Sequence, residues 1–281
     1  MSNVEQNLTP LFAQALRAAK PKSRVDDLGY APFDDCLVEG VAVAKVRAAF
    51  PTADSRPGGR QPRLFAANSS LMLAVNVFAP WLGDLDALEI LKQRDFQDLR
   101  FDLRLPAVEG EAAQWLPVLL VGPNGVIGIE SECTEFLSGH KVEFPDALEA
   151  FWASRPEDGW RRQMRALKAG DEGYGHLDAA RLIKQYMGLR LLLEAAAGDT
   201  GRQLPGMLLY LFWEPLNAAR FDEFSRHRAE IDRFARAVRG ADIEFKAMSF
   251  LDLWAAWSRG KAPKWLPLHM TRLHQLYSFR I

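Results

Sequence analysis

Cysteine is scarce in this chain of 281 residues, since only Cys36 and Cys133 are present and they lie far apart in the sequence. No Cys-x-x-Cys pair and no Cys/His cluster occurs, so neither a zinc site nor a disulfide framework is predicted. Histidine is also rare, and the five histidines include no His-x-x-x-His pair that would place two ligands on one helix face. We therefore expect both cysteines to be reduced and partly buried.

A strong net charge and long apolar runs are lacking as well. The formal charge of −1 predicts no general attraction to nucleic acid or to an anionic membrane, so any such binding would require a local patch. No apolar run approaches the ~20 residues of a membrane span, and the first 20 residues lack the basic and then apolar pattern of a signal peptide. We expect a cytoplasmic protein that does not associate with membranes.

The residues that are present favour a folded protein with a sizeable core, because 48% are hydrophobic and 25% are charged. The first third of the chain has the apolar spacing of helices, and Pro80 is expected to end one of them. Helices are predicted over residues 8–19, 37–50, 68–82 and 85–93. Residues 51–63 are rich in proline, glycine and arginine, which predicts a surface loop or a lid.

From about residue 96 onward the pattern changes to short β-rich runs alternating with amphipathic helices. Strands are predicted over residues 98–105, 116–122, 125–133, 206–213 and 242–250, and helices over 177–197 and 218–240. The second and third strands are joined at Pro-Asn-Gly, which predicts a hairpin. We expect one α/β domain over residues 1–281, with a helical part (1–95) and a core (96–281) in which helices flank a small mixed sheet.

The second strand of this hairpin ends in acidic residues. Alternation along a strand places Glu130 and Glu132 on one face, with Gly128 before them, and Ile127 and Ile129 on the other. Two carboxylates on one face repel each other and raise at least one pKa unless a cation lies between them, and a hard divalent ion such as magnesium is the usual solution. The glycine would leave room for a ligand to approach. The alternative is a strand end at which both carboxylates point into water.

Six segments, spread over most of the chain between residues 68 and 257, resemble a bacterial branch of the PD-(D/E)XK nuclease superfamily, the restriction-endonuclease-like proteins. They are "NSSLMLAVNVFAPWL", "FDLRLP", "LLVGPNGVIGIESECTEFL", "LDAARLIKQYMGL", "LLYLFWEPLNA" and "AMSFLDLWAAW". The resemblance implies a restriction-endonuclease-like core, with a four-stranded mixed sheet flanked by helices. It also implies magnesium-dependent hydrolysis of phosphodiesters and DNA as the ancestral substrate.

The chain departs from the family pattern at the hairpin. Glu130 matches the metal-binding glutamate, but Pro117 in "LPVLL" stands where the family has a metal-binding aspartate. Glu132 in "ESE" replaces the family's lysine, and a carboxylate there would repel the phosphate that the lysine would stabilise.

The helix after the hairpin departs as well. "AARLIKQ" has Arg181 where the family has glutamine and Gln185 where it has histidine, while Lys184 is retained. Helical spacing puts these three residues and Gly188 on one face, and the opposite face, which includes Tyr186, is expected to pack on the sheet.

Three hypotheses for the function remain open. In the first, the fold survives and hydrolysis is lost, so the protein binds DNA. In the second, it is an active DNA endonuclease with a migrated site that uses magnesium or manganese. The catalytic residues would then be Glu130, Glu132, Lys184 and Arg181, and the metal ligands Glu130, Glu132 and Glu111, with Glu109 as an alternative to Glu111. In the third, the protein is a scaffold that binds a protein partner. No motif predicts an organic cofactor, and a homodimer is compatible with all three.

Two further features have alternative interpretations. The basic stretch at residues 160–168 could contact phosphates, but its helical spacing favours a solvated stripe. Trp254 and Trp257, with Trp265, could stack on bases, but the apolar context of the first two favours core packing.

Overall fold

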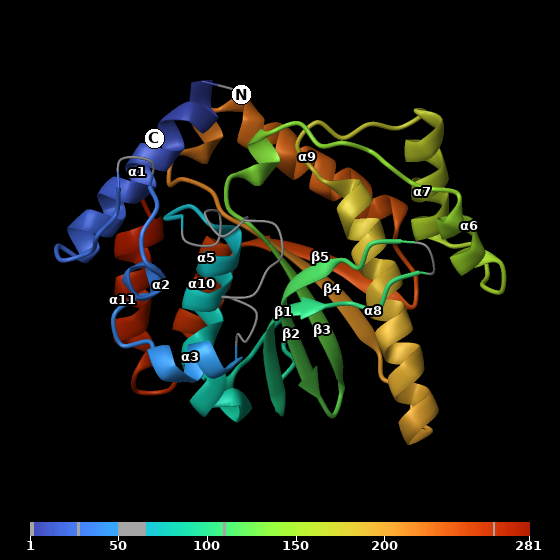
Figure 1. The fold of residues 1–281 in the computed structure, drawn as a ribbon, viewed down its shortest axis with the longest axis horizontal. Helices are drawn as coiled ribbons and strands as arrows, with labels where there is room; N and C mark the ends of the chain where they lie inside the picture. The colour runs from blue at the N-terminus through green and yellow to red at the C-terminus, as the bar shows by residue number, and fades with distance from the viewer. Residues whose placement is uncertain (1–2, 27–28, 50–65, 109–110, 261) are drawn as a thin grey trace.

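A mixed sheet of five strands lies at the centre of the computed structural model, which describes residues 3–26, 29–49, 66–108, 111–260 and 262–281 (Figure 1). The strands, in spatial as well as chain order, are β1 (Asp98–Arg104), β2 (Trp115–Gly122), β3 (Gly125–Glu132), β4 (Gly206–Phe212) and β5 (Ile243–Ser249). The pairs β1–β2 and β2–β3 are antiparallel, and the pairs β3–β4 and β4–β5 are parallel. The predicted α/β class and all five predicted strands are confirmed, and the sheet has one strand more than the resemblance implies.

One face of the sheet is covered by the helices from both ends of the chain. They are α1 (Asn3–Ala19), α2 (Phe33–Cys36), α3 (Val43–Ala49), α5 (Ser70–Phe78), α10 (Phe250–Arg259) and α11 (Leu266–Tyr277), with the 3₁₀ turns η1 (Ala79–Gly83) and η2 (Leu85–Ala87). The apolar cluster on this face, here the first core, includes Val118, Ile127 and Ile129. The buried side chain of Asn76 joins α5 to two other parts of the first core. Its Oδ1 accepts a hydrogen bond from the Val38 N–H at 2.7 Å, and its Nδ2 donates one to Tyr277 Oη at 2.7 Å.

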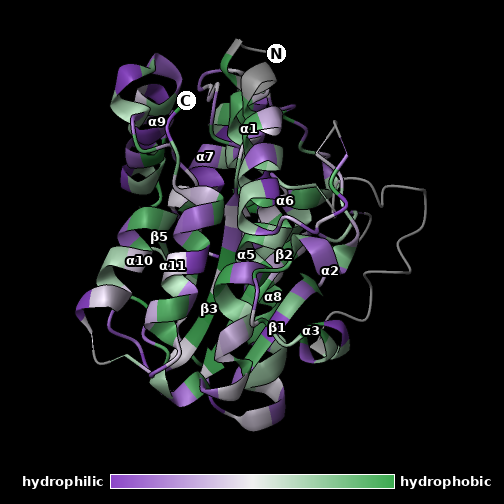
Figure 2. Cartoon of the chain, turned by 90° about the vertical axis from the view of Figure 1, so that its left-hand side faces the viewer, coloured by the Kyte–Doolittle hydropathy of each residue, from purple (hydrophilic) through white to green (hydrophobic). Residues whose placement is uncertain are grey.

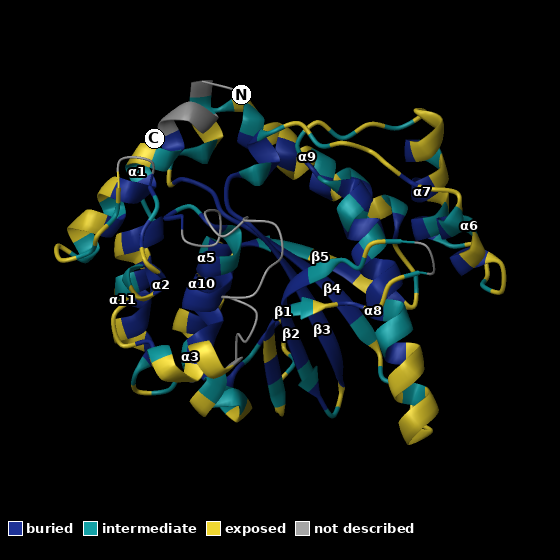
Figure 3. Ribbon diagram, in the orientation of Figure 1, coloured by how far each residue is buried: buried dark blue, intermediate teal, exposed yellow. Residues whose placement is uncertain are grey.

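The other face is covered by α6 (Ala147–Trp152), α7 (Gly159–Ala169), α8 (Ala179–Thr200) and α9 (Asp222–Ala237). Its apolar cluster, here the second core, includes Leu119, Leu208 and Leu189. Figure 3 shows β3, β4 and the first half of α8 largely buried, while the far end of α8 is exposed. Hydrophobic residues run along the strands between the two helical layers (Figure 2).

Two of the expected helices are shorter than predicted or absent. Of residues 37–49, only Val43–Ala49 are helical, because Gly40 has a φ of +87° that interrupts a helix. Residues 85–93 form the short η2 turn and then an extended segment. Leu88 and Ile90 are both fully buried, a period of two that fits extended backbone better than a helix. The predicted loop at residues 51–63 lies outside the described residues.

Candidate functional site

Glu130 and Glu132 lie on the same face of β3, as predicted, and both point into the second core. Parallel pairing places Glu130 beside Tyr210 and Glu132 beside Phe212 on β4. Their side chains are 1% and 3% exposed, so the alternative of a solvated strand end is wrong. Two buried carboxylates require a cation or a proton nearby, because burial penalises the charged form.

Arg181 supplies that cation. Its Nη2 lies 2.8 Å from Glu130 Oε1, and its Nη1 lies 3.2 Å from Glu132 Oε1. The arginine is in the first turn of α8, which begins here because the Asp178 carboxylate accepts a hydrogen bond from the Arg181 backbone N–H at 3.0 Å. Gln185, one turn further on, donates from Nε2 to Glu130 Oε2 and to the Trp115 carbonyl. Two successive turns of α8 therefore hold the carboxylate pair.

The electrostatics of the pair follow from burial. Burial raises the pKa of Glu130 to about 7, although the Arg181 guanidinium acts in the opposite direction. Burial, followed by the charge of Glu135, raises the pKa of Glu132 as well. Among the described residues Glu132 Oε2 has no hydrogen-bond partner. One guanidinium faces two carboxylates, so a single shared proton would make the cluster electrically neutral.

Gly128 does not leave space for a ligand. A Cβ atom at this position would lie 2.9 Å from Leu116 Cδ2 and 3.1 Å from Leu189 Cδ2. These two leucines, from β2 and α8, fill the space above the glycine. The glycine therefore allows α8 to pack closely on the sheet, and the expectation of room for a ligand is wrong.

The expected faces of α8 are confirmed only in part. Leu189 packs on β3, as expected, but Arg181 and Gln185 face β3 as well. Tyr186 instead stacks between helices, with ring centroids 4.4 Å from Trp160 and 5.9 Å from Trp152. Because α8 is covered by the sheet on one side and by α6 and α7 on the other, both of its faces are buried.

Pro117 lies opposite Asp102 in the β1–β2 pair. The pairs Phe101 with Val118 and Leu103 with Leu116 flank these two residues. Val118 belongs to the first core and Leu116 to the second, so the alternation of β2 breaks at the proline. Proline has no N–H to donate to the neighbouring strand. Asp102 has a φ of +50°, and only a few per cent of residues other than glycine have a positive φ. The position at which the family has its aspartate is therefore an irregularity of the sheet here.

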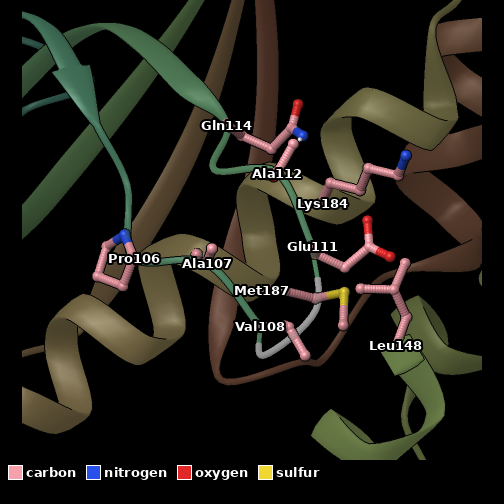
Figure 4. Close-up of a pocket in the computed structure, with 10 residues that line it drawn as sticks. Pro106, Ala107, Val108, Glu111, Ala112, Gln114, Leu148, Lys184 and Met187 are labelled. Atoms are coloured by element: carbon pink, nitrogen blue, oxygen red, sulfur yellow. Dashed lines mark hydrogen bonds between the residues drawn. The ribbon is translucent and has the colours of Figure 1, made fainter. Parts of the chain in front are cut away.

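Lys184 and Glu111 lie apart from the carboxylate pair, in a small recess of about 20 Å³ between the β1–β2 loop and α8 (Figure 4). The Lys184 ammonium lies 5.8 Å from the centre of the Phe144 ring. Among the residues that the structure describes, no group of three or more His, Cys, Asp or Glu side chains is placed to hold a metal ion. Glu109, the alternative ligand, lies outside the described residues.

A magnesium ion does not fit the carboxylate pair as it is arranged. Both carboxylates are engaged by a guanidinium, which would repel a dication at the same place. Pro117 provides no ligand atom, and Glu111 is in the separate recess.

The sequence did not indicate that Tyr210 and His227 extend this polar cluster. His227, from α9, is fully buried, its Nε2 lies 2.8 Å from Tyr210 Oη, and its ring stacks on Phe136 at 4.0 Å between centroids. Burial lowers the pKa of His227 to about 3, so the imidazole is neutral. The available signal was the helical spacing of this histidine with Phe224 and Ile231 on the apolar face of α9.

Glu135, the third acid of the hairpin, has a structural role. Its Oε2 accepts hydrogen bonds from the backbone N–H groups of Cys133 and Thr134 at 3.1 and 3.0 Å, and from the Ser70 hydroxyl. The Ser70 hydroxyl accepts a bond from the Cys133 N–H at 2.7 Å. Glu135 therefore fixes the end of β3 to the start of α5.

The other two features have the structural roles that their spacing favoured. In α7, Arg161 and Arg165 each lie within 3.5 Å of Glu149 and Glu157, and Lys168 pairs with Asp146 at 2.5 Å, so the basic stretch is neutralised by neighbouring acids. The side chains of Trp254 and Trp257 are buried in the first core.

Comparison with known proteins gives no match, whether with a family model, a curated protein or a solved structure. Within the described part of the chain, none of the helices combines the length and the apolar character that crossing a lipid bilayer requires.

Proposed function

We propose that this chain is a PD-(D/E)XK-like protein that binds DNA and does not hydrolyse it. The observation that carries the proposal is the position of Arg181, whose guanidinium contacts Glu130 and Glu132 at 2.8 and 3.2 Å. Support for the family comes from the resemblance of the six segments, and from the hairpin whose second strand carries this buried carboxylate pair.

Three substitutions act together against hydrolysis. The arginine pairs with the carboxylates that a metal would require, position 132 lacks the lysine that would stabilise a phosphate, and the proline at position 117 removes a ligand. A single substitution could be compensated elsewhere, but these three affect metal, phosphate and ligand at once. Loss of catalysis with retention of the core is therefore the simplest account of the site.

Binding to DNA would use the same end of the sheet. A hollow lined by His176, Arg220 and Arg226 lies there, since His176 Nδ1 is 3.1 Å from the carbonyl of Phe136, just after β3. Surface arginines commonly contact the phosphates of DNA, but two acidic side chains, Asp222 and Glu223, also line the hollow. We therefore expect weak binding that falls steeply as salt is added.

The second candidate is an active metal-dependent endonuclease. It is favoured by the unpartnered Glu132 Oε2 and by the 36% exposure of Arg181, which gives the guanidinium a path to solvent. In this case Arg181 would move away from the carboxylates when substrate and metal bind, and Lys184 would be the nearest retained cation of the family pattern.

The test combines three measurements on the purified protein. Cleavage of supercoiled and linear DNA is followed with magnesium or manganese, binding of Mn²⁺ is titrated by calorimetry, and binding of a fluorescent duplex is followed by anisotropy in EDTA. The variants are Glu130→Gln, Arg181→Gln, and the triple Pro117→Asp, Glu132→Lys, Arg181→Gln, which restores the family residues at three of the four positions that depart from the pattern.

We expect the wild type to bind the duplex in EDTA, to cut no DNA and to bind no Mn²⁺, and Arg181→Gln to gain a Mn²⁺ site. Cleavage by the wild type that Glu130→Gln abolishes would replace this proposal with the active endonuclease. Absence of any DNA binding at low salt would instead favour the protein-binding scaffold.

A further inference from the structure

A recess of about 170 Å³ lies on the side of the sheet away from Glu130, between η1, the end of β5, α10 and the start of α11. Its walls are mainly apolar and include Trp81, Met248, Leu253, Trp257 and Leu266. Small-molecule sites in proteins have this kind of lining, with a few polar groups at defined positions.

The aromatic wall of the recess is held in place before any ligand binds. Trp257 Nε1 donates a hydrogen bond to the Glu89 carbonyl at 2.8 Å. The Trp81 ring meets Trp257 edge-on at 5.1 Å and Trp265 at 4.8 Å between centroids. A preorganised wall costs little ordering entropy when a ligand packs against it.

A tight turn at residues 90–93 adds two unusual side chains to the lining. Ile90 and Gln93 exchange backbone hydrogen bonds of 3.0 and 2.8 Å, and between them Leu91 and Lys92 have φ values of +48° and +69°. Positive φ at both central residues is the geometry of a type I′ turn, which strongly favours Asn-Gly. Strained backbone of this kind clusters at binding and catalytic sites, and the side chains of Leu91 and Lys92 both line the recess.

The charges around the recess favour an anion. Lys92 is exposed and forms no ion pair with any residue that the structure describes. Glu89, the acid in the lining, is already paired with Arg94. The side chain of Lys92 is therefore an uncompensated positive charge beside an apolar space.

We propose that this recess binds a small amphipathic monoanion. Its apolar or aromatic body would pack against Trp81, Trp257 and Leu253, and its carboxylate or sulfonate would pair with Lys92. This site is independent of the carboxylate pair on β3, because the walls of the recess belong to the first core.

The test uses two fluorescent probes of similar size, the anion 8-anilinonaphthalene-1-sulfonate and the uncharged N-phenyl-1-naphthylamine, on the full chain. We expect saturable binding of one equivalent of the anion. Lys92→Gln should weaken binding of the anionic probe about fivefold, which is the effect of one partly exposed ion pair. Binding of the neutral probe should be unchanged. Lys264→Gln, an exposed lysine outside the lining, is the matched control and should change neither.

Two further measurements test the apolar part and the class of ligand. The double variant Leu91→Asn with Lys92→Gly suits the turn better, so it should melt no lower than the wild type and yet bind both probes more weakly. The anions 2-naphthoate and decanoate should compete with the sulfonate, and their ranking distinguishes an aromatic from an aliphatic ligand. The proposal is overturned if Lys92→Gln binds the anion as well as the wild type does, if the double variant keeps full binding, or if neither carboxylate competes.

Discussion

Arg181 and Glu130 form an ion pair of 2.8 Å in which the side chain of the acid is 1% exposed and that of the arginine 36% exposed. The arginine side chain is thus only partly buried, while the acid that it pairs with is almost completely buried. The same group contacts Glu132 at 3.2 Å. Since a buried carboxylate without a partner is strongly destabilising, both the stability of the core and the chemistry of the site depend on this one side chain.

Replacement of Arg181 with methionine should therefore destabilise the protein. We expect the free energy of unfolding, measured with urea at about pH 8, to fall by about 3 kcal/mol, the lower end of the range for a broken buried pair, because the arginine is partly exposed. At about pH 5 the loss should be smaller, since both acids can then take up protons and become neutral.

Arg228→Met is the matched control for this variant. Arg228 pairs with a single buried acid, Glu214, whose side chain is 3% exposed, while Arg228 itself is 55% exposed. Arg228→Met should lower the free energy of unfolding by less than Arg181→Met does. An equal effect of Arg181→Met at both pH values would contradict an electrostatic origin.

The raised pKa of Glu130 predicts a pH dependence with a definite sign. Burial raises this pKa from 4.5 to about 7, so between these values the folded protein holds a proton that the unfolded chain releases. The stability that this proton contributes is complete below about pH 4.5 and is lost as the pH rises toward about 7. Glu130→Gln cannot ionise, so its free energy of unfolding should fall less than that of the wild type between about pH 5 and 7.5, by at most about 3 kcal/mol.

The comparison must be between the two proteins, because buried histidines have the opposite effect. Burial lowers the pKa of His227 to about 3 and that of His269 to about 4, so their contribution to stability is lost as the pH falls below about 6.5. This contribution is common to the wild type and Glu130→Gln and cancels in the difference. Parallel stability curves for the two proteins would show that Glu130 titrates normally.

The bond between Tyr210 and His227 should also be measurable. Tyr210→Phe leaves the buried Nε2 of His227 without its partner at 2.8 Å and should cost about 1–3 kcal/mol of unfolding free energy. The double variant with His227→Phe removes both polar groups and should lose less than the sum of the single changes. Strict additivity, measured by urea denaturation of all four proteins, would contradict this pairing.

Alternation along one strand was sufficient to predict the carboxylate face of β3. The partners of that face could not be predicted in the same way. Tyr210 lies beside Glu130 because β3 and β4 pair in parallel with a register that is set by a crossover of more than 70 residues. No local pattern in the sequence encodes that register.

The migrated-site hypothesis grouped Arg181 with Glu130 and Glu132, but the sequence did not predict that α8 turns this arginine toward the sheet. Helical spacing grouped Arg181 with Gln185, but a charged face is normally the solvated one, so this face was expected to point away from the sheet. Because α8 lies between the sheet and the pair α6 and α7, periodicity cannot decide which of its faces meets β3. The polar group turned inward because two buried carboxylates require a cation.

Two glycines, Gly159 and Gly128, allow the close packing of the helices around the site, and the atoms near them predict unequal tolerance. A Cβ at Gly159 would lie 2.3 Å from the Ala237 carbonyl oxygen and 2.6 Å from Val238 Cα, which are backbone atoms at the end of α9. A Cβ at Gly128 would meet the ends of two leucine side chains, which can move. We therefore expect Gly159→Ala to be the more destabilising, by about 3 kcal/mol or more against about 1–2 kcal/mol for Gly128→Ala.

Gly198→Ala serves as the control, because this glycine lies in the exposed part of α8, and a Cβ added to it would have no neighbouring atom within 4 Å among the described residues. Alanine has the higher helix propensity, so this variant should gain about 0.5–1 kcal/mol. Gly159 lies in the first turn of α7, so alanine there also has the higher helix propensity. A net loss of stability in Gly159→Ala would therefore have to come from the close backbone contacts. The contrary outcome is that urea denaturation gives Gly159→Ala a stability equal to or above that of Gly128→Ala. The backbone at the end of α9 would then move freely, and the close packing of α7 on α9 would not constrain the fold.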